Sequence, residues 1–271
     1  PSSIPFGKGA GFLRKTLSKT PADLAVTQIK GVKLLLWSNL LLGLKMVLTW
    51  LCEEQLNIPS VELALSAYLD GQAFPVALGW SALLWSTAKF CLRTAYWGHL
   101  FIGGARLAGF RLPRATWRPL EARTLIEYFN RFSYYFKELL VDFFFVPTFF
   151  RVFRKHPRLR MFFATFMAAG VGNAIFHFVR EVDLVATMGL SGSLVSFASY
   201  AFYCVILATG IGISQVRANA GYRPSPTLAG RLWSFLTVWG FVVCLHVFSD
   251  ESRRHTLLDR CSFLASLFGV G

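Results

Sequence analysis

Five stretches of the chain are apolar and long enough to cross a lipid bilayer as helices. They are residues 32–52, 73–92, 161–179, 184–213 and 232–249. A helix needs about 20 apolar residues to span roughly 30 Å of hydrocarbon. Only 15% of the 271 residues are charged and 54% are hydrophobic, whereas globular chains carry about 25% charged residues. The sequence therefore predicts an all-α integral membrane protein and excludes a soluble domain, a disordered chain and a disulfide scaffold.

The basic residues lie mostly in the short stretches between the apolar segments. The chain has 28 Lys and Arg against 14 Asp and Glu. The positive-inside rule accounts for this excess better than nucleic-acid binding does, so no nucleic-acid partner is predicted. Residues 1–31 are basic and are expected in the cytoplasm, whereas the acidic loop 53–72 faces the other side. The remainder, residues 32–271, is expected to form one membrane domain in contact with lipid.

Residues 124–150 break the alternation of spans and loops. The segment is long enough to span, yet basic residues flank both of its ends and charged residues lie within it. A crossing would place one basic cluster on the wrong side of the membrane and several charges in lipid. We therefore expect re-entrant or interfacial helices with both flanks on the cytoplasmic side.

His177 is the main candidate for chemistry, because it lies in the third apolar stretch. An ionisable residue within a membrane is a functional-site hypothesis, and a neutral imidazole can act as a general base. The alternatives are a structural hydrogen bond between helices, or haem ligation together with His246. Asp142 and Glu138 are four residues apart and would share a helix face. An ion pair with Arg131 or Lys137 is the better interpretation of Glu138.

No metal-binding or phosphate-binding motif is present, and the five cysteines lie in or beside apolar segments. Buried cysteines of this kind behave as small apolar residues. The sequence therefore predicts neither a metal site nor a bound cofactor.

A series of short sequence motifs lies between Tyr96 and Val146-Pro147. The run Tyr96–Pro113 contains Ile102-Gly103-Gly104-Ala105-Arg106 and Gly109-Phe110, and Glu127–Ser133 and Asp142 follow at fixed spacing. Downstream, Ala174-Ile175-Phe176-His177 completes the pattern. In this order and spacing the chain resembles the membrane-bound O-acyltransferase (MBOAT) family, especially its bacterial polysaccharide-acylating branch. The resemblance implies that the chain corresponds to the core of that fold.

Three positions depart from the family pattern. His99 stands where the family has an aspartate, Ala115-Thr116-Trp117 replaces Asn-Phe-Asn, and Ser133 replaces the first active-site histidine. A serine can form hydrogen bonds but cannot act as a base at neutral pH.

The resemblance implies acyl transfer inside the membrane. An acyl thioester, either acyl-CoA or an acyl carrier, would be the donor substrate, and a hydroxyl of a cell-surface glycan or lipid would be the acceptor. His177 would be the general base, helped by Ser133, Asn130 and Asp142. The implied location is the bacterial inner membrane with a cytoplasmic N-terminus, with other membrane or periplasmic subunits as partners. The alternative is a catalytically inert MBOAT-like scaffold or conduit subunit of a membrane complex.

Overall fold

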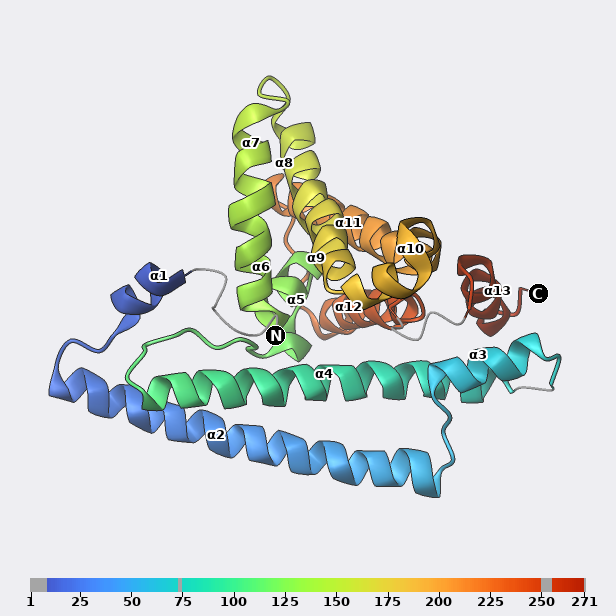
Figure 1. The fold of residues 1–271 in the computed structure, drawn as a ribbon, viewed down its shortest axis with the longest axis horizontal. Helices are drawn as coiled ribbons and strands as arrows, with labels where there is room; N and C mark the ends of the chain where they lie inside the picture. The colour runs from blue at the N-terminus through green and yellow to red at the C-terminus, as the bar shows by residue number, and fades with distance from the viewer. Residues whose placement is uncertain (1–8, 73–74, 250–254, 271) are drawn as a thin grey trace. The chain divides into compact units, whose positions relative to one another are not determined.

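The computed structural model describes residues 9–72, 75–249 and 255–270 (Figure 1). Helices and loops make up these residues, and no β-strand occurs among them. The chain divides into two compact units. Unit 1 comprises the chain up to Leu56 together with Ala88–Ala122 and Glu127–Leu139, and unit 2 comprises Asn57–Thr87, Arg123–Ile126 and the residues from Leu140 onward. The expected N-terminal segment 1–31 is described only from residue 9, where most of it is helical.

Unit 1 contains two long helical segments, and one of them, α2, begins at a side-chain cap. Its elements are α1 (Gly9–Thr16), α2 (Pro21–Thr49), the π-helix η2 (Trp50–Gln55), the part of α4 (Val76–Leu107) after Thr87, the 3₁₀ turn η3 (Pro119–Glu121), most of α5 (Leu125–Phe132) and α6 (Tyr134–Leu140). Helix α2 starts at Thr20, whose hydroxyl accepts a hydrogen bond from the backbone N–H of Asp23. Thr is a preferred N-cap, and Pro21 suits the first helical position.

Polar side chains join α2 and η2 to α4. The Ser38 hydroxyl donates to the Tyr96 carbonyl at 2.8 Å, and the Gln28 amide donates to the Leu107 carbonyl at 3.1 Å. Lys89 Nζ lies 2.5 Å from Glu53 Oε1, so this lysine pairs with a carboxylate within the unit. Such contacts stabilise helix pairs in apolar surroundings, where helix packing gains little from the hydrophobic effect.

Unit 2 is a helical bundle arranged around α11 (Ala198–Asn219). Its other elements are α3 (Val61–Leu69), the start of α4, the π-helix η4 (Val141–Phe145), α7 (Val146–Arg151), α8 (Pro157–Phe166), the π-helix η5 (Met167–Gly172), α9 (Asn173–Val179), α10 (Val182–Ser196), α12 (Leu228–His246) and α13 (Leu257–Leu267). Helix α11 packs against α8, η5, α9, α12 and α13. Buried residues of α11 face these neighbours: Cys204, Leu207, Ala208, Ile211 and Gly212.

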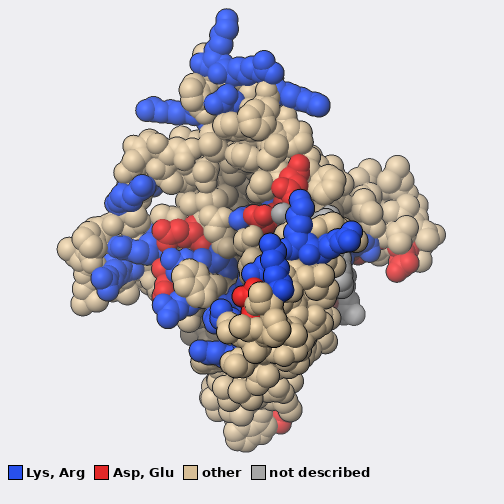
Figure 2. Space-filling model, turned by 90° about the vertical axis from the view of Figure 1, so that its left-hand side faces the viewer, with Lys and Arg blue, Asp and Glu red and all other residues tan. Residues whose placement is uncertain are grey.

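Helices α7 and α8 pack together as a hairpin within unit 2 (Figure 1). Four of the basic residues that follow residues 124–150 lie at its tip: Arg151, Arg154, Lys155 and Arg158. Figure 2 shows this group of Lys and Arg side chains at the top of the molecule, where they project from the end of the hairpin. The apolar hairpin thus ends in a concentrated positive charge.

Four of the described helical segments are long and apolar enough to cross a membrane. They are Pro21–Gln55, Pro157–Val179, Ala198–Asn219 and Leu228–His246. Each overlaps a span expected from the sequence. The expected span 73–92 begins with two residues outside the described set and otherwise lies in α4, which is not among the four. This part of α4 mixes apolar residues with Trp, Ser, Thr and Lys. The helices within residues 124–150 are not among the four either.

The expected long span 184–213 is divided into two helices. Gly189 has φ 69° and ψ 173° and interrupts α10, and Phe197 separates α10 from α11. The break falls at a glycine because glycine is the residue that adopts positive φ without strain. The candidate span here is α11 alone.

Candidate functional site

His177 lies in α9, near the end of the candidate span Pro157–Val179. Its imidazole is half-buried, and its ring centroid lies 4.6 Å from that of Tyr200 and 5.4 Å from that of Phe176. Tyr200, on α11, continues into an aromatic cluster with Tyr203 of the same helix and with Phe197 at its N-cap. The histidine is therefore held between two helices of unit 2 by ring packing.

The helix that carries His177 is irregular one turn earlier. Residues Met167–Gly172 form the π-helix η5, and Asn173 follows as the first residue of α9. Asn173 is 3% exposed, and its side-chain oxygen has no hydrogen-bond partner among the described residues. A buried amide oxygen without a partner costs free energy, and π-helical turns often occur at functional sites. Asn173 and His177 are four residues apart and lie on the same side of the helix.

A second π-helical turn, η4, packs against η5 within unit 2. The contact is close, because a Cβ atom added to Gly172 would lie 2.6 Å from the Phe144 ring. Asp142 belongs to η4 and is exposed. The fold thus brings the segment of Asp142 and the helix of His177 into one unit. Glu138 pairs with Lys137, with Nζ 3.0 Å from Oε1, so the interpretation of Glu138 as an ion-pair residue is confirmed.

Asn130 and Ser133, the other two predicted site residues, lie in unit 1. Asn130 is exposed in the last turn of α5, and Ser133 is the half-buried residue that separates α5 from α6. The Ser133 carbonyl accepts the backbone N–H of Lys137 at 2.9 Å, which starts α6. Ser133 therefore marks the helix break within residues 124–150.

The loop 113–117 is hydrogen-bonded to this break. The Trp117 N–H donates to the Arg131 carbonyl at 2.7 Å, and the Tyr134 N–H donates to the Ala115 carbonyl at 3.1 Å. The Thr116 hydroxyl donates to the Phe132 carbonyl at 2.9 Å. Three hydrogen bonds along five residues hold the loop at a defined position beside α5 and α6.

Tyr135 adds a fourth contact from α6, since its hydroxyl donates to the Pro113 carbonyl at 2.7 Å. Burial, followed by the neighbouring Tyr134, raises the pKa of the Tyr135 phenol, so the group remains a neutral donor. Its ring belongs to the core of unit 1, with these buried neighbours: Leu34, Ile102, Leu112 and Ala115.

An open pocket of about 450 Å³ lies between the loop and the helix break. Its walls are Pro113, Arg114, Trp117, Asn130, Arg131 and Tyr134. Two arginines, an amide and two aromatic rings are suited to an anionic ligand with a flat or apolar part. Asn130 is the one predicted site residue in this wall.

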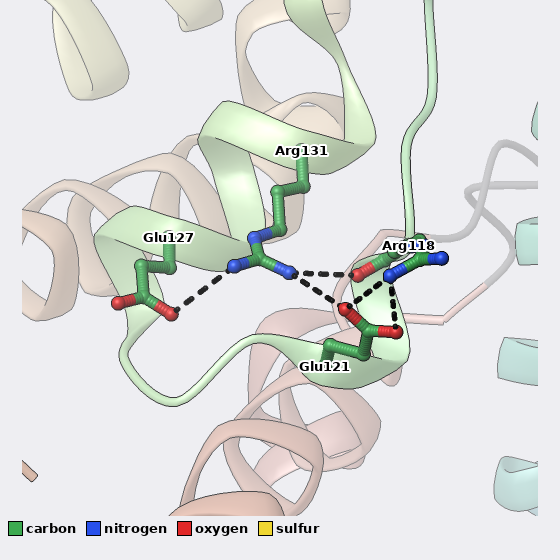
Figure 3. A network of polar contacts seen from close by, with 4 residues as sticks. All are labelled: Arg118, Glu121, Glu127 and Arg131. Carbon is green, nitrogen blue, oxygen red and sulfur yellow. Dashed lines mark hydrogen bonds and ion pairs between the residues drawn. The ribbon is translucent and has the colours of Figure 1, made fainter.

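Arg131 is held by the ion-pair network shown in Figure 3. Its guanidinium lies 3.6 Å from Glu121 and 3.9 Å from Glu127, and it donates to the Arg118 carbonyl at 3.3 Å. Arg118 also pairs with Glu121 at 3.3 Å and has a φ of 48°, which is unusual for a residue other than glycine. Backbone strain of this kind persists where surrounding contacts hold it and is common at binding sites.

Arg114, Trp117, Tyr134 and Asn173 were not predicted from the sequence as site residues. The departure of Ala115-Thr116-Trp117 from the family pattern was the available signal for the pocket. Two other histidines have serine partners in unit 2: His246 with Ser86 and Ser249, and His255 with Ser66. Among the described residues, no group of three or more His, Cys, Asp or Glu side chains is placed to hold a metal ion.

The chain matches no model of a known protein family, and no curated protein is significantly similar to it.

Proposed function

We propose that the chain is an MBOAT-like acyltransferase that moves an acyl group from a thioester donor to a hydroxyl of a cell-surface glycan or lipid. In this proposal His177 takes the proton from the acceptor hydroxyl. The resulting oxygen nucleophile attacks the thioester carbonyl, the C–O bond forms, and the C–S bond breaks. The leaving thiolate receives the proton from the imidazolium. The donor is acyl-CoA or an acyl carrier, and the protein works in a bacterial inner membrane with its N-terminus in the cytoplasm.

The observation that carries the proposal is the position of His177. It follows a π-helical turn inside a candidate span, four residues after Asn173, whose buried side-chain oxygen has no hydrogen-bond partner among the described residues. Ionisable and unpaired polar groups are costly in such surroundings and are retained where they serve a function. The spacing of the sequence motifs gives separate support, and Asp142, which lies in the same unit as His177, is assigned to positioning the acceptor and the base.

Replacing His177 by Ala tests the proposal. Removal of a general base costs about 10²–10⁴-fold in rate, so acyl transfer should fall by that factor while the purified protein melts at an unchanged temperature. The measurement is transfer of a radiolabelled acyl group to surface material in a host whose own copy is deleted. His156→Ala is the matched control, because His156 is exposed at the start of α8.

A second candidate function is an inert scaffold or conduit subunit of a membrane complex. Ser133 favours it, because serine stands where the related enzymes have a histidine and it cannot serve as a base. The same experiment decides between the two. If deletion of the chain abolishes acylation but His177→Ala leaves it unchanged, the scaffold function holds and the catalytic one is wrong.

A further inference from the structure

The pocket of unit 1 contains Arg114, a cation that has no counter-ion among the described residues. Arg114 is half-buried in the pocket wall, and no ion pair or hydrogen bond of its side chain occurs among the described residues. Arg131 differs in this respect, since Glu121 and Glu127 both lie within ion-pair distance of it. A half-buried guanidinium normally finds an acceptor, because leaving its donors unsatisfied costs free energy. Arg114 therefore has unused capacity to bind an anion.

A second positive charge, that of Arg106, lies near Arg114. The Arg106 guanidinium donates twice to the neutral Leu112 carbonyl, at 2.9 and 2.6 Å, and no ion pair of Arg106 occurs among the described residues. Burial, followed by the nearby Arg114, lowers the pKa of Arg106. Like charges at this range repel each other, and an anion placed at Arg114 would relieve the repulsion. Charge thus favours an anion here independently of the shape of the pocket.

The remaining walls supply a further donor and an apolar surface. The side-chain amide of Asn130 has no hydrogen-bond partner among the described residues. Trp117 is 50% exposed, and the Arg131 guanidinium lies 5.4 Å from its ring centroid. Tyr134 lines the same space, and the four hydrogen bonds of loop 113–117 hold these groups in place before any ligand arrives. Preorganisation of this kind lowers the entropic cost of binding.

We propose that this pocket binds a phosphate group, carried either by a phospholipid headgroup or by a soluble phosphate ester. Arg114 forms the forked contact to two phosphate oxygens, the Asn130 amide donates to a third, and Trp117 and Tyr134 cover the adjoining part of the ligand. Arginine suits phosphate because its planar fork of donors matches two oxygens at once. A volume of about 450 Å³ admits a headgroup or a small ester. The proposal is independent of any catalytic role of His177.

The test is a titration of the full chain in dodecyl maltoside micelles with two kinds of probe. Inorganic pyrophosphate, followed by calorimetry, represents soluble phosphate. Phosphatidylglycerol in mixed micelles, followed by retention in native mass spectrometry, represents the lipid headgroup, with diacylglycerol as the lipid that lacks phosphate. Saturable binding of pyrophosphate assigns a soluble ester, and preferential retention of phosphatidylglycerol alone assigns a headgroup.

Two substitutions that each remove one positive charge distinguish binding in the pocket from general electrostatic attraction to the chain. Arg114→Gln should weaken binding about tenfold or more, because it removes a charge-assisted contact. Arg111→Gln should change affinity less than about twofold, since Arg111 lies outside the pocket and pairs with Asp23. Arg114→Lys keeps the charge but loses the fork and should bind with intermediate affinity.

Three results would overturn the proposal. One is an equal loss of affinity in Arg114→Gln and Arg111→Gln, which would mean non-specific attraction to a basic chain. Another is the absence of saturable binding in both arms. The third is displacement of pyrophosphate by succinate at equal affinity, which would make the pocket a carboxylate site.

Discussion

Gly172→Ala perturbs the closest contact between the two π-helical turns of unit 2. A Cβ atom at position 172 would lie 2.6, 2.7 and 2.9 Å from three atoms of the Phe144 ring. Carbon atoms in favourable contact are about 3.5–4.0 Å apart, so the ring would have to retreat by about 1 Å. A phenylalanine ring packed between helices cannot move as freely as the end of a flexible side chain. The substitution therefore strains the core of the unit.

The expected cost follows from two opposing effects. Overpacking of a core typically costs about 1–3 kcal/mol. Alanine is a better helix former than glycine by about 0.5–1 kcal/mol, which offsets part of that loss. We therefore expect the free energy of unfolding to fall by roughly 1–2 kcal/mol. Phe144→Leu provides room, so combining it with Gly172→Ala should cost less than the sum of the two single changes.

The assay is unfolding of the purified chain in dodecyl maltoside by increasing SDS, followed by tryptophan fluorescence. Gly240→Ala is the matched control, because Gly240 lies in α12 of the same unit and nothing lies within 4 Å of a Cβ atom there. That variant should be as stable as the original or slightly more stable. If the Gly172→Ala variant is as stable as the Gly240→Ala variant, the inference that η4 packs too closely on η5 to admit a Cβ atom at position 172 is wrong.

Two further predictions concern topology and pH. Single cysteines at positions 118 and 155, in a chain without its native cysteines, should both be labelled by an impermeant reagent from the cytoplasmic side; labelling from opposite sides would show that residues 124–150 cross the membrane. Backbone and side-chain hydrogen bonds from Thr256 lower the pKa of Asp259 below its ordinary value of 3.8, so its contribution to stability is present above that value and is lost as the pH falls through the lowered pKa. The melting temperature of the original chain should therefore exceed that of Asp259→Asn at pH 6, with a smaller gap at pH 3; a gap that stays constant with pH would contradict the capping role of the carboxylate.

The amino-acid sequence alone predicted the helical class and the positions of most apolar segments. Hydropathy is a local property, because twenty consecutive side chains decide whether a helix can lie in hydrocarbon. Glycine punctuation is also local, and so a break at Gly189 could be anticipated from the sequence. The expected span 73–92 is the exception: it lies mostly in α4, which mixes apolar residues with Trp, Ser and Lys and is not among the four candidate spans of the described residues.

Only the tertiary structure decided which polar groups have partners. Lys89 could have reached toward the membrane surface, but it pairs with Glu53, 36 residues earlier. The pocket exists because hydrogen bonds join loop 113–117 to the residues around the helix break at Ser133. The bonded residues are more than a dozen positions apart in the sequence. The packing of η4 on η5 likewise requires a glycine of one segment to meet an aromatic ring of the other. Such contacts depend on where distant segments meet in space, and no local pattern of residue types encodes that.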